Sequence, residues 1–171
     1  MQLPQGYSRL QVGLHWLSAI IIMWALVSGG LFRIVEFSEG LKEDLAHFNV
    51  SLTLLFIPFF MLRVYLAFST SSSAHVCGPN LMERLARIAH CAIYALTTVV
   101  LISGVLMMKD RADLFGFFYF GPVLTQPTLH EWFGHLHIWS CVALAALIAL
   151  HIGAVIWHQL SGNSVMKRMW L

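Results

Sequence analysis

The sequence predicts an all-α integral membrane protein, an up-down bundle of four helices, from three observations. Of its 171 residues, 58% are hydrophobic and only 11% are charged, whereas a soluble domain carries about 25% charged residues. Four apolar segments each reach about twenty residues or more, the length that a membrane-spanning helix needs. Nine histidines are many for so apolar a chain, and ionisable side chains at membrane depth are costly and usually functional.

The apolar segments predict four helices in a single transmembrane domain that covers residues 1–171. We expect the helices at about 12–32, 45–68, 88–108 and 132–160. The N-terminus lacks a basic region followed by a small-residue cleavage site, so we expect the first segment to be retained and not removed as a signal peptide. Pro58 lies inside the second segment and should kink that helix, which membrane proteins tolerate.

The stretch 114–124 is also apolar, but Gly116, Gly121 and Pro122 interrupt it. We expect it to form an interfacial cap over the bundle and not a fifth span.

The charges outside the segments predict the orientation. The side that holds both termini carries six basic residues and one acid, whereas the opposite side carries four basic residues and seven acids, a net charge of −3. The excess of Lys and Arg favours cytoplasmic termini. The overall net charge of only +2 indicates no role in nucleic-acid binding.

Two histidines in the last segment are the most informative pair in the chain. His137 and His151 are fourteen residues apart, so at 100° per residue they share one helix face, about 21 Å apart along the axis. A bilayer core is about 30 Å thick. One histidine therefore lies near each side of the membrane, where each can bind a metal centre.

A second histidine matches His151 in depth on the side of the termini. His15 follows Arg9 by six residues, and His151 precedes the end of its segment near Leu160 by about 13 Å at 1.5 Å per residue. The depths agree, so we expect His15 and His151 to hold one iron centre.

The opposite side offers a comparable pair. His47 follows Asp44 by three residues, and His137 follows Glu131 by six. Four histidines in two matched pairs predict two stacked haems and a path for electrons across the membrane. An iron with two histidine ligands and four porphyrin nitrogens has no open position, so it passes electrons and does not readily bind oxygen.

The cysteines indicate how haem is held. Cys77, Cys91 and Cys141 form no CxxC pair and no CxxCH motif, so a haem here should be b-type, held by coordination and packing alone. Two further histidines, His90 and His158, lie at shallow depth on the side of the termini. They are candidates for contacts with a haem propionate or a quinone carbonyl. No catalytic side chain is identified.

Several segments resemble the bacterial cytochrome b561 proteins, which are four-helix dihaem cytochromes of the inner membrane. The resemblance covers nearly the whole chain in the right order. It rests on YSRLQVGLHW (7–16), LAHFNVSLTLLFIPFFMLR around His47, ARIAHCAIYALTTVVLISGVLMM around His90, HIGAVIWH at the end of the last segment, and the C-terminal NSVMKRM. The family implies four haem ligands that map onto His15, His47, His137 and His151.

The resemblance also suggests a reaction. One well-known member of the family is a superoxide oxidase, which takes an electron from superoxide at the periplasmic face and reduces ubiquinone through the two haems. By that resemblance the quinone lies near the haem on the side of the termini, with His90 and His158 as candidates. One departure matters, because superoxide is an anion and the opposite side here carries a net charge of −3.

Two other functions stay open. The chain is also similar in architecture to the dihaem cytochrome b subunits of formate dehydrogenases and nickel-iron hydrogenases, which anchor a partner and pass its electrons to quinone. In that case a periplasmic redox protein or a larger respiratory complex would dock on the acidic side. A structural membrane protein without haem is the third reading, and the histidine pattern disfavours it.

Overall fold

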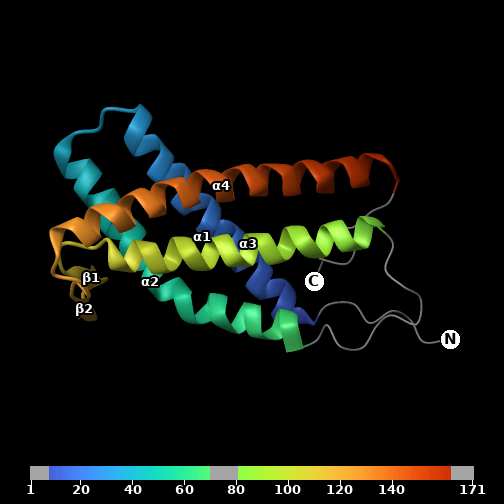
Figure 1. Ribbon diagram of the computed structural model, residues 1–171, viewed down its shortest axis with the longest axis horizontal. Coiled ribbons are helices and arrows are strands. Elements are labelled where there is room, and N and C mark those ends of the chain that lie inside the picture. The colour runs from blue at the N-terminus through green and yellow to red at the C-terminus, as the bar shows by residue number, and fades with distance from the viewer. Residues whose placement is uncertain (1–7, 70–80, 163–171) are drawn as a thin grey trace.

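The computed structural model describes residues 8–69 and 81–162. Its elements follow the order α1 (Arg9–Ile34), α2 (Glu39–Ser69), α3 (Leu81–Leu106), β1 (Ala112–Leu114), β2 (Phe118–Phe120) and α4 (Pro127–Leu160). All four helices are long and apolar enough to cross a membrane. Helices α1 and α3 run in one direction and α2 and α4 in the other (Figure 1), so the predicted four-helix up-down membrane bundle is confirmed.

The two ends of the bundle differ. The α1–α2 connection and the two strands lie at one end, which we call the hairpin end. Helix α1 begins and α4 finishes at the other, which we call the terminal end (Figure 1).

Each helix begins three to seven residues before the apolar span that the sequence marks. Polar groups explain the longer starts, because the first turn of a helix favours acids and side-chain caps. The hydroxyl of Ser8 caps α1 by accepting from the backbone N–H of Gln11, and the side-chain oxygen of Gln11 accepts from the backbone N–H of Ser8. Glu39 lies in the first turn of α2, and Pro127 takes the first position of α4, where a missing N–H costs nothing.

The segment between α3 and α4 is a β-hairpin, which the sequence analysis did not predict. Its strands pair antiparallel, with Ala112 opposite Phe120 and Leu114 opposite Phe118. The turn holds Phe115 and Gly116 at positive φ, a conformation that glycine adopts freely and that tight hairpin turns need. The segment forms no fifth span; it is a short ordered hairpin that packs on α2.

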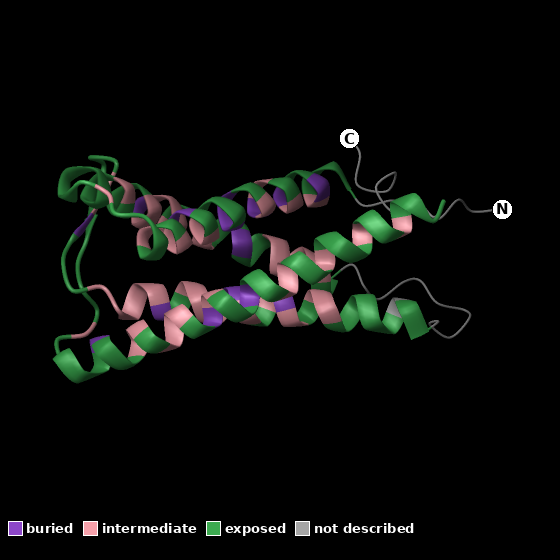
Figure 2. Cartoon of the chain, turned by 90° about the horizontal axis from the view of Figure 1, so that it is seen from above, coloured by how far each residue is buried: buried purple, intermediate pink, exposed green. Residues whose placement is uncertain are grey.

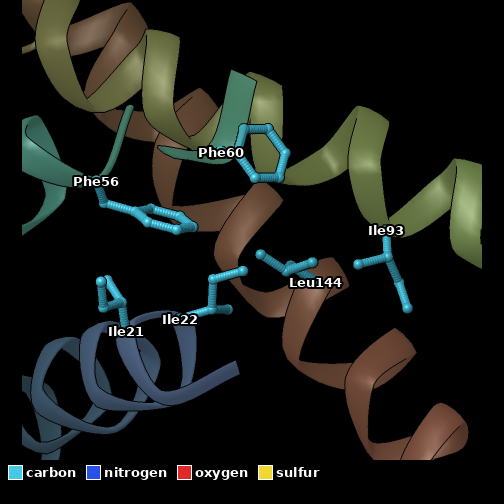
Figure 3. Close-up of a cluster of buried hydrophobic side chains, with 6 residues drawn as sticks. All are labelled: Ile21, Ile22, Phe56, Phe60, Ile93 and Leu144. Atoms are coloured by element: carbon cyan, nitrogen blue, oxygen red, sulfur yellow. The ribbon is translucent and has the colours of Figure 1, made fainter. Parts of the chain in front are cut away.

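The helices pack mainly as two pairs, α1 with α2 and α3 with α4, and α2 also meets α3. One cluster of buried side chains joins all four helices near mid-length (Figure 3): Ile21, Ile22, Phe56, Phe60, Ile93 and Leu144. Leu144 and Phe56 are each only 1% exposed. This cluster fixes the two pairs against each other.

The outward faces of the bundle are apolar, and exposed residues cover most of them in Figure 2. The interior instead holds small hydroxyl side chains, and Ser18 and Ser103 each donate to a backbone carbonyl one turn earlier. Small polar residues between helices and large apolar residues outside are typical of membrane bundles.

Candidate functional site

The imidazole of His137 is held by helix α3. Its Nδ1 lies 3.0 Å from the backbone carbonyl oxygen of Val100 and 3.2 Å from Oγ of Ser103. A carbonyl can only accept, so Nδ1 carries the ring proton and Nε2 keeps its lone pair. This is the tautomer with which a histidine binds a metal through Nε2 while a carbonyl orients the ring.

Two small residues, Gly104 and Cys141, also lie beside the His137 ring. A Cβ atom placed on Gly104 would lie 3.2 Å from Cε1 of His137, so a larger residue there would push the ring by a few tenths of an ångström. On α4, Sγ of Cys141 lies 3.5 Å from Nε2 of His137. The sequence analysis missed these contacts, although Cys141 follows His137 by one helical turn and shares its face.

A cavity of about 330 Å³ opens beside His137 and is lined by all four helices. Its lining is chiefly apolar, and 300–1,000 Å³ is the usual range for ligand pockets. Two residues that line it, Asn49 and Thr97, each have a buried side-chain oxygen without a hydrogen-bond partner among the described residues, Oδ1 and Oγ1 respectively. Arg33 also lines the cavity. A flat apolar group with anionic edges and a metal for Nε2 fits these residues, and haem is such a group.

The structure does not bring His47 to His137. The side chain of His47 is exposed and lines a separate open hollow of about 320 Å³ between α2 and the hairpin. It lies three and seven residues before Val50 and Leu54, which line the main cavity, so it shares their face of α2 one turn nearer the hairpin end.

A second cluster lies at the terminal end and joins four helices. The rings of His90 and His151 are 5.1 Å apart between centroids, edge to face. His15 interacts electrostatically with both. His15 and His151, the predicted partners, therefore belong to one electrostatic cluster, which also contains His90. His158 lies two turns further along α4, half-buried near the helix end.

The cluster also contains a cation that the sequence analysis counted only as an anchoring charge. Nη2 of Arg63 lies 2.9 Å from Nδ1 of His15, and its guanidinium carbon lies 5.2 Å from the centre of the Tyr94 ring. The sequence did contain a sign of this role: Arg63 lies inside an apolar segment, and a charge at that depth is costly unless it has a function.

The two histidine clusters are separated by the core. Leu144 lies midway between His137 and His151 on α4, and Phe56 and Phe60 pack beside it (Figure 3). The terminal-end cluster contains three imidazoles and the hairpin-end cavity one. No group of three His, Cys, Asp or Glu side chains suited to a bare metal ion occurs within the described part of the chain. Imidazole pairs suit an iron that brings four porphyrin nitrogens of its own.

Two comparisons with known proteins show what the chain is similar to. The model of a family described as prokaryotic cytochrome b561 matches residues 6–171. A protein of Escherichia coli (strain K12) named cytochrome b561 homolog 2 is 26% identical over 172 residues, which cover 97% of this chain and 92% of that protein.

Proposed function

The chain belongs to the prokaryotic cytochrome b561 family, and from this premise we propose that it reduces ubiquinone with electrons taken from superoxide, through two b-type haems. Members of this family carry electrons across the bacterial membrane by haem b, and the four apolar helices make the chain a multi-pass membrane protein. The proposal rests above all on α4, which presents one histidine to each end of the bundle on a single face.

In this proposal His47 and His137 hold the haem at the hairpin end, and His15 and His151 hold the other. The Nε2 lone pair of His137 and the adjoining cavity support the first site. The meeting of His15 with His151 supports the second. His47 needs a side-chain rotation toward the face it shares with Val50, and its exposed position leaves room for one.

A bound haem supplies a one-electron carrier. The protein's own residues do the rest: they fix the imidazoles, keep water out of the mid-bundle core and separate the two sites by about 21 Å along α4. The buried layer of Phe56, Phe60 and Leu144 excludes solvent between the sites. Six-coordinate iron leaves no position for oxygen, which favours electron transfer over oxygen chemistry.

The quinone site is proposed at the terminal end, taken as cytoplasmic. His90 and His158 are the donors that a quinone carbonyl would meet there. His90 is already in ring contact with His151, so it lies close enough for a quinone bound to it to exchange electrons with that haem. Superoxide would then be oxidised at the hairpin end, near Lys42, Lys109 and Arg111, whose side chains are exposed.

A second function is favoured by the acidic surface at the hairpin end. Glu39, Glu43 and Asp44 are exposed at the start of α2, and this charge repels an anion but attracts a basic protein. The chain would then be the dihaem membrane anchor of a periplasmic redox protein or a larger respiratory complex, and would pass that partner's electrons to quinone.

One assay separates the two functions. Superoxide and a soluble ubiquinone analogue are added to the purified protein, and haem reduction and quinol formation are followed by absorbance. We expect both in the parent protein. Haem that stays oxidised in superoxide but accepts electrons from a reduced partner would favour the anchor function.

The same assay tests the quinone site. We expect His90→Ala and His158→Ala to keep two haems and to lower the rate of quinol formation by about tenfold or more, since each removes a polar group that orients the substrate. His135→Ala, an exposed histidine at the other end of α4, is the matched control and should keep the parent rate. Parent rates in both test variants would contradict this site, and loss of haem in His90→Ala would make His90 a ligand.

A further inference from the structure

Arg63 is a cation inside the bundle. It lies on α2 within a membrane-spanning helix, and its side chain is half-buried. Its neighbours are the imidazole of His15 and the ring of Tyr94. No ion pair joins it to an acidic side chain in residues 8–69, 81–82 and 84–162, the side chains that the structure describes. A charge held this way acts strongly on its surroundings, because little water or counter-charge screens it.

The hairpin-end site differs in two ways. Arg33, the cation that lines its cavity, is exposed, so solvent screens its charge more than that of Arg63. There the proton on Nδ1 of His137 points at the carbonyl oxygen of Val100. A hydrogen bond of this kind makes the imidazole more basic. A more basic ligand favours the oxidised, more positive iron and so lowers the reduction potential of a haem bound to it.

The terminal-end site lacks such a bond on His15. Arginine has only donors, so Nδ1 of His15 accepts from Arg63 and its ring proton lies on Nε2. Ligation of iron through Nε2 moves that proton to Nδ1, and Arg63 must then release the ring. The face of Tyr94 attracts the cation independently, so the charge stays within the cluster.

We propose that Arg63 sets the direction of electron flow, because its positive charge raises the reduction potential of the terminal-end haem above that of the hairpin-end haem. A nearby cation favours the reduced iron, which carries one positive charge less. Together with the Val100 carbonyl at the other site, it directs electrons from the hairpin end to the terminal end. This inference rests on the proposed function only in requiring a haem at each site.

The test is a redox titration of the purified protein with its haems. The terminal-end component is first identified as the spectral component that His151→Ala lacks. Arg63→Gln removes the charge and keeps a hydrogen-bonding side chain. We expect the reduction equilibrium of that component to fall about tenfold, or about 59 mV for a one-electron couple, while the hairpin-end component stays at its parent value.

Two further variants control for charge and for folding. Arg63→Lys keeps the charge and should keep the parent potential. Arg87→Gln removes an exposed charge from α3, also at the terminal end of the bundle, and should leave the potential unchanged as well. If Arg63→Gln loses the haem, Arg63→Lys becomes the test. A tenfold fall in the reduction equilibrium of its terminal-end haem would contradict a role for the charge.

Other results overturn the proposal outright. An unchanged potential in Arg63→Gln with both haems bound would do so, and so would a parent protein whose terminal-end haem has the lower potential. The titration uses neither superoxide nor quinone, so it can succeed where the proposed reaction fails. Haem stoichiometry, measured first, shows separately whether both sites are filled.

Discussion

Single side chains decide how each histidine can serve as a ligand. The lone pair on Nε2 of His137 is free because the ring proton is on Nδ1, which donates to the Val100 carbonyl. The ring lies close to residue 104 on α3, where a side chain would force it to shift. Nothing comparable holds His47, whose side chain is exposed in the structure. The hairpin-end site therefore depends more on α3 and α4 than on α2.

Gly104→Ala should weaken haem binding at the hairpin end. The added Cβ would meet Cε1 of His137 at 3.2 Å, closer than an ordinary contact, so the ring must shift from its hydrogen bonds. Changes in the groups that orient a ligand typically cost about 10-fold or more in affinity. Haem content and the spectrum of that component measure the effect.

Gly134→Ala is the matched control for this prediction. Gly134 is also helical, and nothing lies within 4 Å of the Cβ it would gain. It should retain both haems. Equal haem loss in the two variants would show that helix stability, and not the seat of His137, determines the result.

At the scale of elements, the hairpin between α3 and α4 covers part of the candidate site. Oγ of Ser51 on α2 donates to the backbone carbonyl of Asp113 at 2.6 Å, and the rings of Phe48 and Phe115 meet edge to face. The same residues border the hollow that His47 lines. The hairpin thus forms one wall of the open hollow beside His47.

Gly116→Ala should loosen the hairpin without unfolding the helices. Gly116 has φ +78°, and an alanine in that region costs about 1–2 kcal/mol. We expect faster amide hydrogen exchange in residues 112–120 and an unchanged rate in α1–α4. Gly121→Ala, where φ is not positive and the new Cβ meets nothing within 4 Å, should exchange like the parent. Protection that stays the same in Gly116→Ala would contradict the role of this turn.

At the scale of the whole molecule, the sequence predicted the helices and the histidine pattern because both follow from regular spacing. A span of about twenty apolar residues needs no tertiary information, and neither does the fourteen-residue interval on α4. The hairpin was missed because strands of three residues are too short to show an alternating pattern. The place of Arg63 was missed because its contacts with His15 and Tyr94 join three helices, and pairing across helices depends on how they rotate.

Charge at the hairpin end decides whether superoxide is the substrate. If it is, at least one of Lys42→Ala, Lys109→Ala and Arg111→Ala should lower the rate of haem reduction by superoxide by up to about tenfold. Added salt should also lower the parent rate, because 0.1 M salt screens the attraction between an anion and a surface charge beyond about 10 Å. Arg84→Ala, an exposed charge near the opposite end, is the control. No drop in any of the three, with haem content intact, would favour a docked partner as the donor.

Four histidines that hold two haems at two depths should be visible in the reduced-minus-oxidised spectra of four single variants. We predict that His15→Ala and His151→Ala lose the same spectral component, and that His47→Ala and His137→Ala both lose the other. The control His135→Ala should keep both components. If His15→Ala instead lost the component that His47→Ala loses, the assignment of ligands by depth would be contradicted.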